Sequence, residues 1–302
     1  MLETETVLDR RRLRRSLTLW RGAGIGAVML ALGAMIFGGD KLAALGGQKQ
    51  IARIAIEGTI TEDREQLKML KDITDDEHVL GVVLYVNSPG GTTTGGEALY
   101  EGLRNLAKKK PLVAQFGTVA ASAGYIVGLA SDHIVARGNT ITGSVGVIVQ
   151  WPELAQLLDK IGVKVNEVKS GRLKASPSPF EPLDAAGRQV AEGMVQDGFK
   201  WFLSLVEDRR GIKGSDIAGL TEGRIFSGRE ALSAKLVDEI GGEDEAVKWL
   251  KDVKNVDKDA KLIDWKPKSS STFGLSAMSS RAATSLLGEQ AAQLAQIVMR
   301  DP

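Results

Sequence analysis

The chain of 302 residues lacks cysteine and has only two histidines, His78 and His133. The absence of cysteine excludes a disulfide framework, a thiolate metal site and a cysteine nucleophile. Two histidines are too few for the multi-histidine sites that bind transition metals. We therefore expect neither a bound metal nor a cofactor.

A charge excess of either sign is also missing. Lysine and arginine number 39 against 38 aspartates and glutamates, which gives a net charge of +1 at pH 7. A nucleic-acid-binding domain would show a basic excess, so we expect no nucleic-acid partner. With 43% hydrophobic and 25% charged residues, the composition is that of a folded globular protein.

One long hydrophobic run stands near the beginning of the chain. Six arginines lie between positions 10 and 21, and residues 22–39 then carry no charge. A helix of this length spans about 27 Å, close to the ~30 Å hydrocarbon core of a bilayer. The arginines should stay on the cytoplasmic side, which places the rest of the chain outside the cytoplasm. We expect a single-pass signal anchor in a lipid bilayer; a cleaved signal peptide and a buried core helix are the alternatives.

Strand-like and helix-like segments alternate in the remainder of the chain. Strands are predicted at 51–56, 80–86, 112–116, 133–137, 145–149 and 163–168. Helices are predicted at 62–76, 95–110, 121–131, 151–161 and 184–210. In the last of these, Val195, Phe199, Phe202 and Val206 form one apolar stripe that should face the core or another subunit. This rhythm is typical of an α/β fold with crossover connections.

The same patterns suggest five segments along the chain. They are a basic cytoplasmic segment (1–21), the anchor (22–39), a linker (40–50), one folded domain (51–264) and a Ser- and Ala-rich tail (265–302). Within the tail, 268–285 is typical of a linker and 286–299 could form a short amphipathic helix. The proline-rich stretch 176–182 should be a loop.

Two short motifs offer chemistry at predicted helix starts. Asn87–Gly91 (NSPGG) follows a buried strand, and free N–H groups there could hold an oxyanion, a phosphate or a carbonyl. A turn without a ligand is the alternative. Ser122, in AASAGY (120–125), is surrounded by small residues in the field of a helix N-terminus. Its alternative role is that of an ordinary N-cap.

A serine nucleophile needs a base. His133 lies eleven residues after Ser122, about 16 Å along a helix, and His78 lies in an acidic turn, so we do not expect a histidine-based triad. A neutral lysine can serve instead. Lys174 follows a predicted strand and precedes the proline-rich loop, so it could project into a cleft; a surface lysine is the alternative.

Four motifs occur together in one order. They are NSPGG at 87–91, AASAGY at 120–125, TGSVGV at 142–147 and SGRLKA at 170–175. In this combination, residues 51–264 resemble the short bacterial form of the signal peptide peptidase A family. The members of this family are serine proteases that are anchored in a membrane and use a Ser/Lys dyad. Residues 228–242 are similar to a segment shared with the wider crotonase and Clp-protease fold. The resemblance implies a crotonase/Clp-protease-like α/β fold of repeated ββα units behind an N-terminal transmembrane helix.

The resemblance also implies roles for individual residues. Ser122 matches the nucleophile, Lys174 the general base, and Ser144 the hydroxyl that orients the lysine. The oxyanion hole would be formed by backbone N–H groups of Gly90, Gly91 and Ala123. The implied activity is degradation of cleaved signal peptides and other hydrophobic peptides. The implied assembly is a homo-octamer in which each lysine serves the serine of a neighbouring subunit.

Three positions depart from the family pattern. Ala123 stands where glycine is usual, Leu173 where an aromatic residue is common, and Tyr85 where arginine is frequent. None of these removes a catalytic group. Two other functions remain open: a crotonase-type acyl-CoA enzyme, which needs no Ser/Lys pair, and a catalytically silent membrane scaffold.

Overall fold

The computed structural model describes residues 48–267. The expected membrane anchor at 22–39, the Ser-rich segment 268–285 and the helix expected at 286–299 lie outside the described residues. Among the helices of 48–267, none combines the length and the apolar character needed to span a bilayer.

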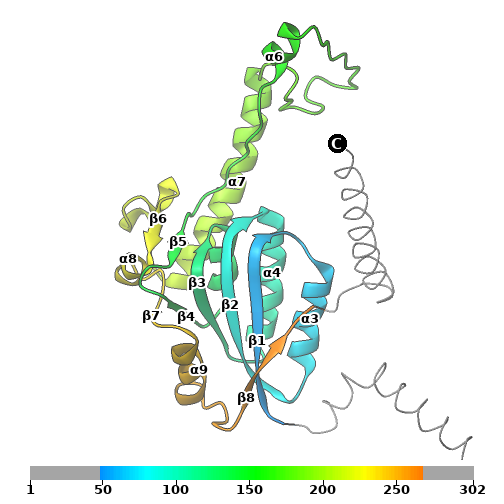
Figure 1. The fold of residues 1–302 in the computed structure, drawn as a ribbon. Helices are drawn as coiled ribbons and strands as arrows, with labels where there is room; N and C mark the ends of the chain where they lie inside the picture. Colours follow the sequence, from blue (N-terminus) through cyan, green and yellow to red (C-terminus); the bar gives the residue numbers. More distant parts are fainter. Residues whose placement is uncertain (1–47, 268–302) are drawn as a thin grey trace, which may run out of the picture.

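Eight strands form a single sheet at the centre of the described chain (Figure 1). The strands are β1 (Gln50–Ile60), β2 (Val79–Gly91), β3 (Leu112–Ala121), β4 (His133–Ala136), β5 (Ile141–Gly143), β6 (Ile225–Ser227), β7 (Glu239–Ile240) and β8 (Lys261–Trp265). Their order is β6-β5-β3-β2-β1-β8, and β4 pairs with β3 and with β7. All pairs are parallel except β5–β6. This confirms the α/β architecture with crossovers.

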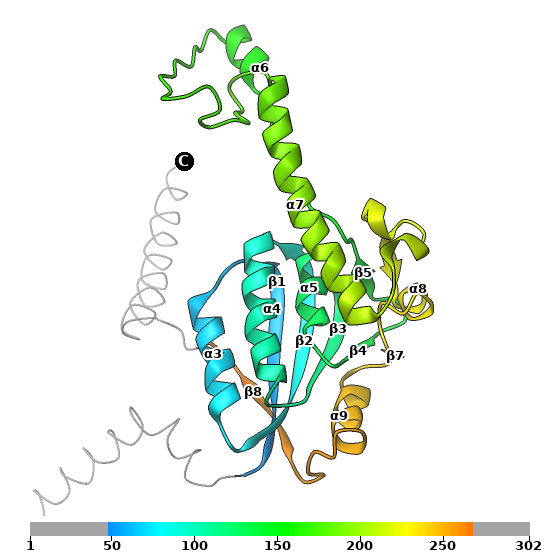
Figure 2. The same ribbon diagram turned by 180° about the vertical axis from the view of Figure 1, so that it is seen from behind.

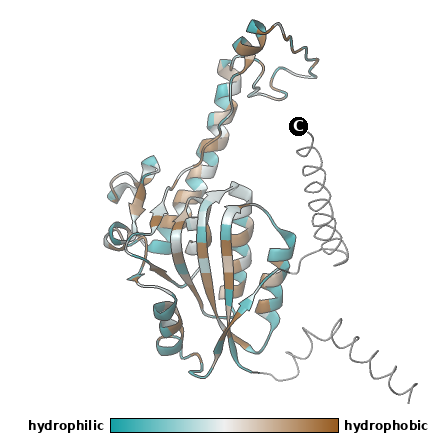
Figure 3. Ribbon diagram, in the orientation of Figure 1, coloured by the Kyte–Doolittle hydropathy of each residue, from teal (hydrophilic) through white to brown (hydrophobic). Residues whose placement is uncertain are grey.

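Helices cover the two faces of the sheet unequally. They are α3 (Arg64–Asp75), α4 (Thr93–Ala107), α5 (Ala123–Leu129), α6 (Ala155–Lys160), α7 (Ala185–Arg210), α8 (Gly228–Ser233) and α9 (Glu243–Asp252). One face carries α3, α4, α5 and the C-terminal part of α7, as seen from behind in Figure 2, and α9 covers part of the other face. Because β2 is buried from both sides, its sequence is a continuous apolar run, visible as hydrophobic colour in the central strands of Figure 3.

One part of the chain leaves this compact body. Residues 146–200, here called the arm, comprise the connection after β5, α6, a long loop and most of α7, and they project beyond the sheet (Figures 1 and 2). Many apolar side chains of the arm are exposed, including Ile148, Leu157, Ile161, Val168 and Met194. The body, in contrast, buries its apolar residues in two clusters.

Three predictions within the arm are wrong. Residues 145–149 and 163–168 form no strand, because the alternating apolar residues have no neighbouring strand to complete their backbone hydrogen bonds. The helix expected at 151–161 is reduced to α6. Its expected first turn is lost because the Leu154 N–H donates to the Pro179 carbonyl at 2.7 Å, a partner outside the helix.

The long helix α7 agrees closely with its prediction. Asp184 caps its start by accepting a hydrogen bond from the Gly187 N–H at 2.6 Å, and Gly211 ends it with a left-handed φ of 63°. Of the predicted apolar stripe, Phe202 and Val206 are fully buried against the body. The predicted loop at 176–182 contains no helix or strand.

Candidate active site

Ser122 occupies a strained turn between the end of β3 and the start of α5. Its φ of 54° and ψ of −123° lie in a region that residues with a Cβ rarely adopt. Although Ser122 stands at the N-cap position of α5, its hydroxyl makes no capping hydrogen bond. The N-cap interpretation therefore fails for the side chain. A serine on a strained strand-to-helix turn is the arrangement that presents a nucleophilic hydroxyl outward.

Gly90 lies directly against this serine. A Cβ built on Gly90 would lie 2.9 Å from the Cβ and 3.2 Å from the Oγ of Ser122, and the φ of Gly90 is 120°. Only glycine meets both conditions. The Gly90 N–H donates to the Ser88 hydroxyl at 3.1 Å. β2 runs through NSPGG to Gly91, so the turn expected after residue 86 comes later, where the Thr92 side chain caps α4.

Ser144 is brought to the same place by the neighbouring strand. β5 pairs in parallel with β3, with Ala121 opposite Gly143, and the Ser122 N–H donates to the Gly143 carbonyl at 2.9 Å. Ser144 follows immediately, also with a positive φ, of 53°. Its N–H donates to the Arg224 carbonyl at 2.9 Å. The carboxyl ends of two adjacent strands thus place both serines at one edge of the sheet.

Glycines in α4 and α5 allow α5 to pack closely against α4 and β2. A Cβ on Gly124 would meet the Ser88 carbonyl oxygen at 2.7 Å, and a Cβ on Gly96 would lie 3.2 Å from the Cβ of Ala123. Any larger side chain at Gly124 would push α5 away from β2. These glycines therefore have a structural use at this site.

Lys174 is not part of this group in the single chain. It lies on the arm in a short turn, where its N–H donates to the Gly171 carbonyl at 3.0 Å, and its side chain is exposed. The loop that contains it stands at the end of α7 farthest from the sheet (Figure 1). The structure brings together Gly90, Ser122 and Ser144, and leaves Lys174 apart.

Both histidines lie away from Ser122, as predicted. His133 begins β4, beyond the opposite end of α5, with its Nε2 3.1 Å from the Glu239 carboxylate and its ring stacked on Trp249 at 4.9 Å. His78 is exposed in its acidic turn beside Asp76. Within the described chain, no group of three or more metal-ligating side chains is present.

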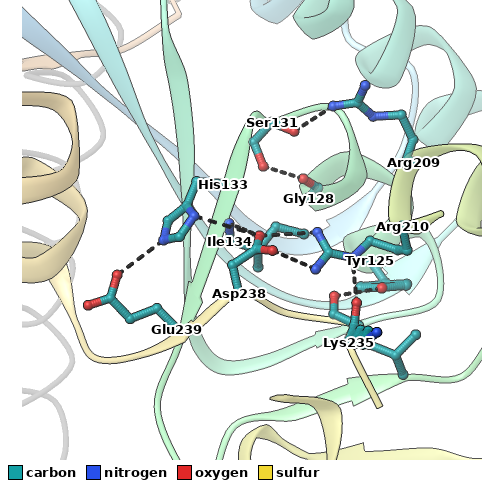
Figure 4. Close-up of polar contacts among 11 residues, drawn as sticks. Tyr125, Gly128, Ser131, His133, Ile134, Arg209, Arg210, Lys235, Asp238 and Glu239 are labelled. Carbon is teal, nitrogen blue, oxygen red and sulfur yellow. Dashed lines mark hydrogen bonds and ion pairs between the residues drawn. The ribbon is translucent and has the colours of Figure 1, made fainter. Parts of the chain in front are cut away.

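A polar cluster that sequence patterns did not single out holds the far end of α5 (Figure 4). The Arg209 guanidinium donates to the carbonyls of Leu129 and Ser131 at 2.9 and 2.7 Å. Arg210 forms a two-pronged ion pair with Asp238, with contacts of 2.7 and 3.1 Å. The two arginines in the last turn of a long helix could have indicated a polar contact at this helix end. Their partners could not be predicted, because they lie far away in sequence.

Burial and charge act against each other in this cluster. Burial by itself would raise the pKa of Asp238, but hydrogen bonds from Arg210 and the Ile134 N–H hold it below its usual value. Tyr125, inside α5, donates to the Leu236 carbonyl at 2.7 Å, and burial raises the pKa of its phenol. Asp238 is therefore charged, and Tyr125 neutral, at physiological pH.

Comparisons with known proteins agree on one family. The sequence profile of Peptidase family S49 matches residues 104–257, and that of Clp protease matches residues 51–140. A candidate protease from Synechocystis is 33% identical over 219 residues, covering 72% of this chain and 79% of that protein. Protease 4 of Haemophilus influenzae is 33% identical over 75% of this chain and 38% of its own length.

Two further similarities concern a named relative and a solved structure. A protein of Enterococcus faecium described as a candidate signal peptide peptidase SppA is 33% identical over 72% of this chain and 67% of its own length. A mutant of the membrane-bound stomatin-specific protease 1510-N superposes with a TM-score of 0.49 at 14% identity, covering 73% of this chain and 99% of that one. With its Clp-protease-like α/β body, the chain belongs to peptidase family S49 and is a serine peptidase related to signal peptide peptidase A.

Proposed function

We propose that the protein is a membrane-anchored endopeptidase that hydrolyses signal peptides and other hydrophobic peptides with a Ser122 nucleophile and a Lys174 base. The observation that carries the nucleophile is the strained backbone of Ser122, whose hydroxyl makes no capping bond and faces Gly90. Strain of this kind persists only where the surrounding structure enforces it, and it concentrates at active sites.

The chemistry follows from the groups around the scissile carbonyl. Neutral Lys174 takes the proton of the Ser122 hydroxyl as its oxygen attacks the peptide carbonyl carbon. Amide N–H groups among Gly90, Gly91 and Ala123 stabilise the negative oxygen of the tetrahedral intermediate. To donate to this oxygen, the Gly90 N–H gives up its hydrogen bond to the Ser88 hydroxyl. Protonated Lys174 then gives its proton to the leaving amine, and water hydrolyses the acyl-enzyme.

The position of the base supports a shared active site. Lys174 belongs to the arm, which projects away from the body that carries Ser122 (Figure 2). The apolar side chains exposed along the arm favour its burial against another subunit. We therefore assign Lys174 of the partner subunit to each Ser122, with Ser144 orienting the amine, in a homo-oligomer that the family resemblance makes an octamer.

The anchor fits the same function. Residues 22–39 would hold the assembly in the cytoplasmic membrane with the peptidase domain on its outer side, where hydrophobic peptides partition. The basic segment before the anchor would remain in the cytoplasm. Membrane extraction of the full-length protein with carbonate tests this part separately, because an integral protein stays in the membrane fraction.

Cleavage of a synthetic signal peptide by the full-length protein tests the dyad. We expect Ser122→Ala and Lys174→Ala each to abolish cleavage, and co-assembly of the two variants to restore part of it. Ser233→Ala is the matched control, because this hydroxyl donates only to the Arg229 carbonyl of its own short helix. Cleavage retained by both single variants would exclude the dyad, and inactivity of the intact wild type would favour the scaffold.

The pH profile tests the chemical nature of the base. Only the neutral amine accepts a proton, so kcat/KM should rise toward alkaline pH. A profile that stays flat between about pH 5 and pH 9 would exclude a lysine base.

A further inference from the structure

The arm leaves the body through two segments, the connection after β5 and the C-terminal part of α7. In α7 the buried residues that reach the core are Phe202 and Val206, near its C-terminus, and the preceding turns extend past the body. The other buried positions, Gly187 and Ala191, lie at the far end of the helix, within the arm. The connection from β5 to α6 contains no helix or strand, so the packed last three turns of α7 are the main support for the orientation of the arm.

Because α7 is long, a small rotation at its attached end moves the far end of the arm by a larger distance. From Arg209 to the start of α7 the helix is roughly 36 Å long, so a rotation of about 1.6° at the base moves the tip by about 1 Å. Displacements of about 1 Å in a reacting group can lower a rate by 10²-fold. Any contact that fixes the base of α7 thus bears on the placement of Lys174 in its partner active site.

Arg209 makes one of these contacts, to the C-terminal end of α5. Its guanidinium donates from Nε to the Leu129 carbonyl. A terminal nitrogen donates to the Ser131 carbonyl, the contact drawn in Figure 4. Leu129 is the last residue of α5 and Ser131 lies two residues after it, at the end of the helix opposite to Ser122. A guanidinium that donates in two directions fixes rotation as well as distance, which a single hydrogen bond does not.

The two helices joined by this contact differ in how else they are held. Every residue of α5 is buried, and the helix packs against β2, β3 and α4. A second arginine, Arg104 of α4, also donates to its C-terminal end, at the Ala130 carbonyl, 2.7 Å away. The C-terminal part of α7 is also held by Phe202 and Val206 in the core and by the Arg210–Asp238 ion pair. Loss of Arg209 therefore leaves α5 restrained and removes the hydrogen bonds that fix α7 relative to the end of α5.

We propose that Arg209 is a positioning residue for Lys174, fixing the base-carrying arm to the body so that the lysine reaches the serine of the partner subunit. This rests on the proposed shared active site. It assigns to Arg209 an effect on catalysis in a neighbouring subunit, although Arg209 lies at the end of α5 opposite to its own Ser122.

Co-assembly of two marked chains isolates the direction of this effect. One chain carries Ser122→Ala and supplies only Lys174; the other carries Lys174→Ala and supplies only Ser122. Both are co-expressed at full length with different tags and purified through both tags. Arg209→Gln is then introduced into one chain or the other, and cleavage of a synthetic signal peptide is measured.

We expect Arg209→Gln in the lysine-supplying chain to lower kcat roughly ten- to a hundredfold with little change in KM. In the serine-supplying chain the same substitution should change kcat less than about twofold, because α5 keeps its other contacts. Arg209→Lys in the lysine-supplying chain should recover part of the rate, since an ammonium can still donate to one of the two carbonyls. Light scattering should give the same assembly mass throughout.

Arg104→Gln is the matched control, because it removes an arginine contact to the same end of α5 without touching the arm. Its effect should appear in the serine-supplying chain. Equal losses from Arg209→Gln in both chains, a loss confined to the serine-supplying chain, or no loss would each overturn the proposal. If Arg209→Gln prevents assembly, the comparison between chains is made with Arg209→Lys. Inactivity of the unsubstituted pair would instead contradict the shared active site itself.

Discussion

The body and the arm of this peptidase differ in how far their apolar side chains are buried. In the body, β2 and β3 are buried on both faces, and Ser122, Gly90 and Ser144 are fixed by backbone contacts between strands. In the arm, apolar side chains such as Val168 and Leu157 are exposed, and α6 buries no residue. The comparison indicates that the surroundings of the proposed nucleophile Ser122 are formed within one chain, whereas those of the proposed base Lys174 depend on what the arm contacts.

The sharpest test of this contrast exchanges glycine for alanine in each region. Gly90→Ala places a methyl group 2.9 Å from the Ser122 Cβ at a φ of 120°, so we expect kcat to fall about 10²–10³-fold. Gly193→Ala, on the exposed face of α7, meets nothing within 4 Å. It should leave kcat unchanged and stabilise the helix by about 0.5–1 kcal/mol.

Steady-state kinetics on a signal peptide and thermal unfolding measure the two effects. An active Gly90→Ala variant would show that the turn at Ser122 can relax, which would remove the argument from strain. A large loss of activity in Gly193→Ala would show that this face of the arm is already packed against a partner at close range.

Large-to-small substitutions along α7 test where the helix is attached. Phe202 is 1% exposed, and Phe202→Ala should cost about 3–5 kcal/mol of unfolding free energy. Met194 is 66% exposed in the single chain, so Met194→Ala should cost a dissociated subunit less than about 0.5 kcal/mol. Urea unfolding at matched protein concentration measures both. Similar costs at the two positions would contradict the division of α7 into an attached and a projecting part.

Acid sensitivity distinguishes an ion pair of the body from one of the arm. The folded pKa of Asp238 lies below its unfolded value of about 3.9, so its stabilising contribution is present above that value and disappears as pH falls through the folded pKa. Asp238→Asn should lower stability near pH 7 and flatten its decline between about pH 5 and pH 2. Asp184, paired with exposed Arg172 on the arm, provides the comparison.

Asp184→Asn should lower stability near pH 7 by less than about 1 kcal/mol, because exposed ion pairs contribute less than this and asparagine still caps a helix. Thermal unfolding across this pH range measures both variants. Unaltered acid sensitivity in Asp238→Asn would show that the Arg210 pair does not stabilise the base of the arm.

Local patterns in the sequence were sufficient for most elements of the body. The apolar run at 80–86 predicted a strand buried on both faces, and the stripe ending in Phe202 and Val206 predicted the inward side of α7. The motif around Ser122 located the strand-to-helix turn, and the identification of the family followed from four motifs in order. These features succeed because burial imposes periodicity on neighbouring residues.

Sequence patterns did not predict features that depend on contacts between residues far apart in the chain. Residues 145–149 and 163–168 alternate as strands do, but no strand of the described chain lies beside them. The contact of Gly90 with Ser122 and the attachment of Arg209 to α5 join residues that are far apart in sequence.

The sequence by itself therefore determined the family and most elements of the body, and it supplied the candidates for the catalytic groups. Only the tertiary structure decided that Gly90, Ser122 and Ser144 share one edge of the sheet, and that Lys174 stands apart on an arm. The physical reason is that hydropathy and helix caps act between residues a few positions apart, whereas strand order and the direction of α7 arise from packing between remote segments.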